Sequence, residues 1–208
     1  YYKGAFVNGD CSAEKAYVEQ EFPDGVQCVL TCGYLNGTEI GYGECEWTIP
    51  GADYTLNFKG NWRDGCYNGA GVLTYTYNDG TVSVYDGNFK DSRCDGSLVL
   101  TTTYPSDNEK YQYIYDGSWS EGTKSGFGSE KSIYANGSVW MYVGQFEDGK
   151  YQGYGKVTYT NEDGSIYRSE GKFENGEPVD GTPFTLFSAD GSVDSTGTWQ
   201  NGEQVINS

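Results

Sequence analysis

Short stretches of alternating residue type, separated by turn-forming pairs, run along most of the chain. At 72–77 and 156–160, β-branched and aromatic residues alternate with polar ones, which is typical of strands with one buried face. Asp-Gly or Asn-Gly pairs occur at 79–80, 136–137 and 163–164. Such pairs supply the positive φ angles that a tight hairpin turn requires. The pattern therefore predicts β-hairpins rather than helices.

One motif returns at nearly constant intervals. The order aromatic-x-Gly-x-aromatic occurs at 58–62, 85–89, 115–119 and 142–146, and weaker copies surround it. The central glycines are Gly4, Gly33, Gly60, Gly87, Gly117, Gly144, Gly171 and Gly197. They are 29, 27, 27, 30, 27, 27 and 26 residues apart, which is too regular for unrelated segments and too short for independent domains. We expect a single domain, 1–208, of about eight units that each rest on their neighbours.

A second glycine pair follows the motif within a unit. Gly-x-Gly occurs at 41–43, 69–71, 126–128 and 153–155, and in the last three copies a turn glycine comes nine residues later. In this order the residues resemble the MORN repeat (membrane occupation and recognition nexus). The resemblance implies an all-β fold: one hairpin per repeat, with hairpins side by side in an elongated, twisted, single-layer antiparallel sheet.

The chain departs from the familiar 23-residue MORN unit, because most of its units have 27 residues. Both arms of one hairpin are longer by two residues. An even insertion keeps every side chain on its original face, whereas an insertion of one would move a whole strand to the wrong face. We therefore expect a broader sheet of the same type.

The motif places glycine between two aromatic side chains on one face of a strand. A ring from the adjacent strand can then lie flat over backbone that has no Cβ. Aromatic side chains bury about 150–250 Å² each, so these rings can form a core without a second layer. The second aromatics of the motifs define the predicted structural ladder: Phe6, Trp62, Phe89, Trp119, Phe146, Phe173 and Trp199.

Two segments, 10–32 and 94–114, fit the repeat least well. We expect irregular loops or an extra short element there. The best helical candidate of the chain, 12–18, lies in the first segment and is only about two turns long.

The chain carries 13 Lys and Arg against 30 Asp and Glu, a formal net charge of −17. A field of this sign repels nucleic acid and anionic lipid headgroups. We therefore expect no nucleic-acid partner, and the charge argues against binding to anionic membranes. The partner that remains is a protein or a second copy of the chain.

All six cysteines lie in the first half of the chain. Six cysteines permit 15 pairings. Position in the repeat favours Cys66–Cys94 and Cys32–Cys45, which leaves Cys11–Cys28. Disulfides would indicate an oxidising compartment; free buried thiols and a thiolate metal site at the Cys28-x3-Cys32 spacing are the alternatives.

Asn36-Gly37-Thr38 and Asn136-Gly137-Ser138 match the acceptor pattern for N-glycosylation. The same Asn-Gly pairs are turn chemistry that the repeat needs in any case. Asn36 and Asn136 are therefore candidate glycosylation sites in a secreted or cell-surface protein, with a purely structural role as the alternative.

The sequence contains no His, which removes the common nucleophile–base pairs and imidazole metal sites. Most Asp residues before turn glycines fit backbone-bonding roles, although weak calcium binding between acidic turns stays open. We expect no catalytic residues, no cofactor and no metal site, and hence not an enzyme. The function we favour is an extracellular scaffold or protein-interaction module that self-associates end to end. The alternatives are a lipid-binding MORN module and a carbohydrate-binding or glycoside-active aromatic surface.

Overall fold

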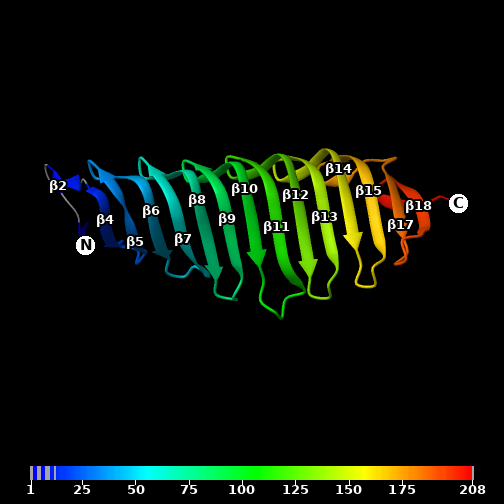
Figure 1. Cartoon of the computed structure of the whole chain (residues 1–208), viewed down its shortest axis with the longest axis horizontal. Helices are drawn as coiled ribbons and strands as arrows, with labels where there is room; N and C mark the ends of the chain where they lie inside the picture. The colour runs from blue at the N-terminus through cyan, green and yellow to red at the C-terminus, as the bar shows by residue number, and fades with distance from the viewer. Residues whose placement is uncertain (1, 4–5, 8–9, 12, 208) are drawn as a thin grey trace. The chain divides into compact units, whose positions relative to one another are not determined.

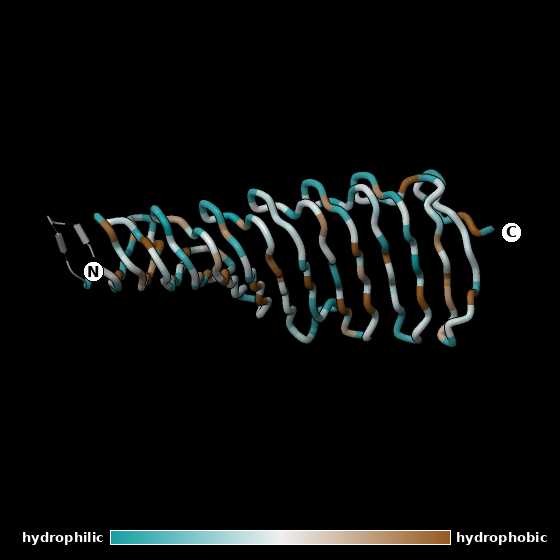
Figure 2. The backbone as a smooth tube through the Cα atoms, turned by 45° about the horizontal axis from the view of Figure 1, so that its top comes forward, coloured by the Kyte–Doolittle hydropathy of each residue, from teal (hydrophilic) through white to brown (hydrophobic). Residues whose placement is uncertain are grey.

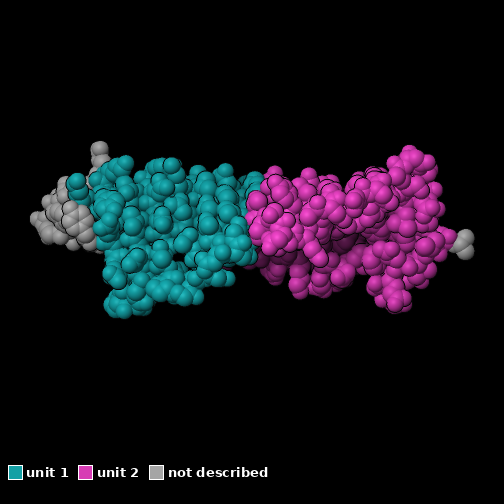
Figure 3. All heavy atoms as spheres, turned by 90° about the horizontal axis from the view of Figure 1, so that it is seen from below, with its two compact units in different colours: residues 1–102 teal, residues 103–208 magenta. Residues whose placement is uncertain are grey.

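The computed structural model describes residues 2–3, 6–7, 10–11 and 13–207, and side chains for Lys3 and 15–207. These residues contain strands and turns without any helix, so the predicted all-β class is confirmed. No helix of the described part is long and apolar enough to cross a membrane. The chain divides into two compact units, unit 1 (1–102) and unit 2 (103–208) (Figure 3); the single repeat domain stays a prediction.

Unit 1 is one antiparallel sheet in which each strand pairs with the next along the chain (Figure 1). Its strands are β4 (Ala13–Glu21), β5 (Gln27–Leu35), β6 (Thr38–Thr48), β7 (Tyr54–Arg63), β8 (Cys66–Tyr77), β9 (Val82–Lys90) and β10 (Arg93–Thr103). The short β1 (Tyr2–Lys3) pairs with β4, while β2 (Phe6–Val7) and β3 (Asp10–Cys11) pair with each other.

Unit 2 repeats this arrangement of consecutive hairpins. Its strands are β11 (Lys110–Ser120), β12 (Thr123–Tyr134), β13 (Val139–Glu147), β14 (Lys150–Thr160), β15 (Ile166–Glu174), β16 (Glu177–Pro178), β17 (Pro183–Phe187), β18 (Val193–Gln200) and β19 (Glu203–Ile206). Both β16 and β17 pair with β15. Figure 2 shows hydrophilic residues gathered at turns and hydrophobic residues within the strands.

At the predicted turn pairs 79–80, 136–137 and 163–164, only the glycine has a positive φ angle, of 86° to 89°. Tighter turns with two left-handed residues close other hairpins. Asn36 and Gly37 have φ angles of 51° and 78°, and Asp148 and Gly149 have 49° and 77°. This pair of left-handed residues matches the twist of the flanking strands. At 91–92 the same geometry is kept without glycine, since Asp91 and Ser92 have φ angles of 48° and 62°.

The motif rings lie over the bare backbone of two glycines. A Cβ built on Gly155, in β14, would meet Cε2 and Cζ of Tyr142 at 2.5 Å, and one on Gly144 would meet Cα of Gly155 at 2.6 Å. Gly155 is therefore covered by a ring from the adjacent strand β13, as expected. Gly144 is covered by the ring two residues earlier in its own strand, which the sequence analysis did not foresee. Phe58 and Tyr115 cover their glycine pairs in the same way.

The segments that fit the repeat least are more regular than expected. Segment 10–32 contains β4 and most of β5, so 12–18 is not helical from Ala13 onward. The reason is alternation: Ala16, Val18, Cys28 and Leu30 are all buried on one face of this hairpin. Segment 94–114 holds most of β10 and the start of β11, and only 104–109 between them is a longer loop.

We predict that Gly144→Val lowers the free energy of unfolding by more than about 2 kcal/mol. The branched side chain would need the space that Tyr142 and Gly155 occupy, 2.6 to 2.7 Å from the built Cβ. Urea unfolding measures the change. Ser129→Val is the matched control, because Ser129 points away from the rings, and it should change stability by less than about 0.5 kcal/mol. Equal effects of the two variants would show that the rings do not hold the sheet.

Candidate functional site

Each unit presents two different faces. We call the face that carries the buried motif rings the ringed face, and the opposite face the open face. Of the predicted ladder, Trp62, Phe89, Trp119, Phe146 and Phe173 are buried at 8% exposure or less. Trp199 is half-buried and donates from Nε1 to Oη of Tyr167 at 3.0 Å. The side chain of Phe6 lies outside the described residues.

The ringed face of each unit contains a cluster of aromatic rings in mutual contact. Tyr142 stacks on Tyr151 with ring centroids 3.8 Å apart and meets Phe146 and Phe173 edge-on at 5.2 and 5.3 Å. Phe58 and Tyr67 repeat the stacked pair in unit 1, also at 3.8 Å. Such contacts add about 0.5–1.5 kcal/mol each beyond the area that they bury. The first aromatics of three motifs, Phe58, Tyr115 and Tyr142, therefore anchor their repeats, although the predicted ladder contained only the second aromatics.

Two of the four Gly-x-Gly hairpins lack an aromatic residue two positions before the first glycine, since Glu39 and Lys124 stand there. At Lys124 the replacement forms a charged pair that the sequence analysis missed. Lys124 occupies the position of Tyr67 and Tyr151, two residues before Gly-x-Gly. Its Nζ lies 4.8 Å from the ring centroid of Tyr115, so a cation–π contact replaces the stacked ring. Glu130 stands where the equivalent strands have Leu73 and Val157. Only comparison of the repeats, position by position, could have found this exception.

Lys124 and Glu130 neutralise each other within the ringed face. Lys124 Nζ lies 2.8 Å from Glu130 Oε2, with side-chain exposures of 18% and 15%. Tyr151 donates from Oη to Glu130 Oε1 at 3.1 Å, and Lys124 also donates to the hydroxyl of Tyr113. Burial and, after it, the charge of Glu130 raise the pKa of Tyr113 and Tyr151. The cluster is therefore neutral overall and internally hydrogen-bonded.

The thiols of Cys28, Cys32, Cys45, Cys66 and Cys94 are free in this structure. Burial raises the pKa of Cys28 and Cys32 to about 12, so both thiols stay protonated at neutral pH. Cys45 accepts a hydrogen bond from Trp47 Nε1 at 3.2 Å. Among the described residues, no group of three or more Cys, Asp or Glu side chains could hold a metal ion.

The structure thus contains neither the Cys32–Cys45 nor the Cys66–Cys94 bridge. Cys45 pairs across the sheet with Leu30, which makes Cys32 its diagonal neighbour. Diagonal neighbours lie about 7–8 Å apart, more than the roughly 4.4–6.8 Å between Cα atoms of a disulfide. For Cys11–Cys28, Cys28 is free and the side chain of Cys11 lies outside the described residues. The oxidised state stays a prediction.

The two candidate glycosylation sites lie in hairpin turns. Asn36 and Asn136 are both exposed, in the turns that join β5 to β6 and β12 to β13. Asn136 Oδ1 accepts from the backbone N–H of Ser138 at 3.0 Å, which is the structural role that the repeat requires.

The acidic turns use their carboxylates locally. Asp79, Asp163 and Asp190 each accept a hydrogen bond from the backbone N–H two residues later, at 2.8 to 2.9 Å. Hydrogen bonds from Thr81, Ser165 and Ser192 lower the pKa of these carboxyl groups. These contacts are the Asx turns that close hairpins.

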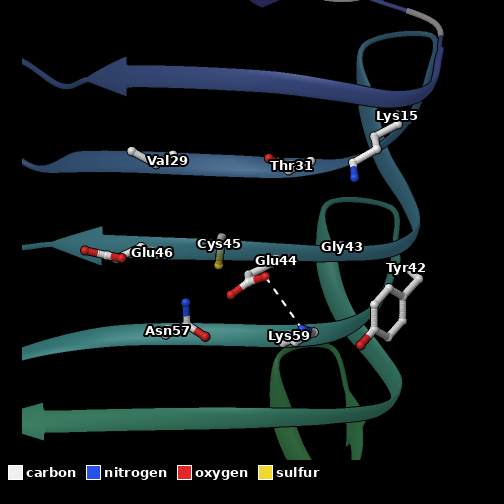
Figure 4. A pocket seen from close by; sticks show the side chains of 10 residues that line it. All are labelled: Lys15, Val29, Thr31, Tyr42, Gly43, Glu44, Cys45, Glu46, Asn57 and Lys59. Atoms are coloured by element: carbon white, nitrogen blue, oxygen red, sulfur yellow. Dashed lines mark ion pairs between the residues drawn. The ribbon is translucent and has the colours of Figure 1, made fainter.

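The open face of unit 1 contains a hollow of about 470 Å³ over β4 to β7 (Figure 4). Tyr42 stands at its rim with 64% exposure. Glu44 and Lys59 form an exposed ion pair at 3.9 Å, and Glu46 and Asn57 face each other across β6 and β7. The hollow is wide enough for a large side chain of a partner and presents both charges.

Comparison with known proteins agrees with this architecture. The family model described as MORN repeat matches at 58–82, 115–139 and 142–164. These matches contain the glycine pairs that Phe58, Tyr115 and Tyr142 cover. The predicted resemblance to the MORN repeat is thus confirmed at these three places. No curated protein matches the chain.

We predict that Lys124 and Glu130 are strongly coupled. Glu130→Val alone should destabilise the protein by about 1–3 kcal/mol, because Lys124 loses its carboxylate inside the ringed face. Adding Lys124→Tyr restores the Tyr and Val combination of β14 and should recover most of the loss. A double-mutant cycle in urea should therefore give a coupling above about 1 kcal/mol.

The control cycle uses the exposed pair Lys156 and Glu170, 3.8 Å apart with side-chain exposures of 41% and 70%. Its coupling should stay below about 0.5 kcal/mol, since solvent screens exposed ion pairs. A coupling for Lys124 and Glu130 as small as that of the control would contradict a compensating role for the pair.

Proposed function

We propose that this protein is a non-catalytic scaffold that binds protein partners through its open faces. One observation carries the proposal: the rings close only one face of each sheet. The other face presents side chains at fixed intervals, about 4.8 Å between strands and about 6.8 Å between every second residue of a strand. Repeats conserve this frame while the side chains on it differ, as in Tyr42, Ala70, Phe127 and Tyr154 at equivalent positions.

The exposed side chains suit protein contact. Tyr42, Phe127, Met141 and Tyr154 are among the large apolar residues with at least 36% exposure. Exposed aromatic side chains are enriched at protein interfaces, where they act as anchors. The net charge of −17 opposes the alternative of an anionic lipid surface.

The proposal predicts that partner contacts map to the open face. A photo-crosslinking amino acid at Val143, on the open face, should capture partners that the same residue at Asn161, in a turn, does not. A captured partner, once purified, should bind Val143→Arg at least about tenfold more weakly and Asn161→Arg equally well. Partners that bind only through turns, or that are indifferent to both variants, would refute this function.

We further propose an extracellular or other oxidising location, supported by the six cysteines and the two exposed acceptor asparagines. Peptide mass mapping of the native protein without reduction should then show Cys–Cys linked peptides. It should also show glycan mass on peptides that contain Asn36 or Asn136. Six free thiols together with unmodified asparagines would contradict this location.

A further inference from the structure

Over the four strands β12 to β15, the open face of unit 2 has the opposite charge to the chain as a whole. Sixteen side chains occupy it on four strands: the odd positions of 127–133 and 139–145, and the even positions of 154–160 and 166–172. Four of them are cations: Lys131, Lys156, Arg168 and Lys172. Glu170 is the one anion, so this grid carries +3 in a chain of −17.

The matched grid of unit 1 has the reverse sign. Its positions stand at the same distances from the equivalent motif glycines of unit 1. They are the even positions of 42–48, the odd positions of 55–61, and the even positions of 70–76 and 82–88. Its charged residues are Glu44, Glu46, Asp86 and Lys59, a net −2. The two grids have the same strand spacing, because equivalent glycine pairs lie opposite each other on neighbouring strands in both units.

The shapes of the two faces are also complementary. Phe127 and Tyr154 protrude from the open face of unit 2, with 64% and 74% of their surfaces exposed. The open face of unit 1 has the hollow of about 470 Å³ between Val29, Glu46 and Lys59. An exposed ring that finds a recess on another copy is a known route to self-association.

Both open faces carry apolar side chains that no second layer covers. Val72 and Val84 in unit 1, and Val143 and Ile166 in unit 2, stand on these grids. Antiparallel sheets that pack face to face lie about 10 Å apart and interdigitate such side chains. A second sheet of equal spacing is therefore the covering layer that these faces fit best.

We propose that the open face of unit 2 binds the open face of unit 1 of a second copy of this chain. The proposal rests on the proposed function, since it names one partner for the open faces. The occupant is a copy rather than a polyanion such as nucleic acid, because the open face of unit 1 complements the +3 grid in charge, strand spacing and shape, whereas a polyanion complements it in charge alone. At physiological salt, charges more than about 8 Å apart are screened, so the contacting grids decide the interaction.

Charge reversal and mixing test this arrangement. Lys131→Glu with Lys172→Glu makes the unit 2 grid negative, and Glu46→Lys with Asp86→Lys makes the unit 1 grid positive. None of these four residues forms an ion pair within the part of the chain that the structure describes. Light scattering with sedimentation velocity, at physiological salt and up to ~1 mM protein, measures the assembly.

The wild type should show at least twice the 22.9 kDa mass of one chain. Each reversed variant alone should associate at least about tenfold more weakly. An equimolar mixture of the two variants should associate again, because each reversed grid then meets a grid of opposite sign. A chain that carries all four substitutions should likewise regain self-association. Tyr154→Ala should weaken association without any change in charge.

Lys110→Glu with Lys150→Glu is the matched control, since it changes the net charge of unit 2 equally but off the grid. It should associate like the wild type, and circular dichroism should show that every variant is folded. A monomeric wild type, or variants that fail to restore association on mixing, would overturn the proposal. Such a result leaves the crosslinking test of Val143 against Asn161 unaffected, so failure of self-association and failure of the proposed function are separate results.

Discussion

The fold depends on planar rings that lie on backbone without Cβ atoms. Gly144 and Gly155 let the ring of Tyr142 lie flat across two strands, and the same ring meets Phe146, Tyr151 and Phe173. Because each ring contacts its own hairpin and the adjacent one, the aromatic surface is buried between successive hairpins. A sheet built in this way needs no second layer on its ringed face, and its other face is left to solvent.

The two faces of each sheet therefore differ in how strongly packing constrains their side chains. Substitutions on the ringed face meet backbone atoms at 2.5 to 2.9 Å around the motif glycines, so this face is closely constrained. Side chains on the open face vary between polar, aromatic and charged at equivalent positions without touching the rings. The repeated frame can therefore carry a basic grid in unit 2 and an acidic grid in unit 1 on the same backbone geometry.

The sequence predicted the hairpins, their period and their tight turns because glycine and aromatic residues have specific backbone and packing requirements. It failed where the cause is tertiary packing. The hairpin 13–35 has only a weak copy of the motif around Gly33, yet buried Ala16, Val18 and Leu30 make it regular. The alternation of side chains along a strand predicts the face of the sheet on which a ring lies, but not the direction in which the ring tilts. The covering of Gly144 by a ring from its own strand was therefore missed. The hollow beside Tyr42 was also beyond prediction, since it depends on how neighbouring side chains leave space.

The pair of Lys124 and Glu130 distinguishes β12 from the equivalent strands of the other hairpins, whose sequences are otherwise similar. Its charges are satisfied only where Tyr115 and Tyr113 precede it and Tyr151 follows it. Were another hairpin to exchange places with this one during folding, an ammonium or a carboxylate would face apolar neighbours without its counter-charge. A buried polar pair in an aromatic series can thus fix the order in which segments of similar sequence assemble.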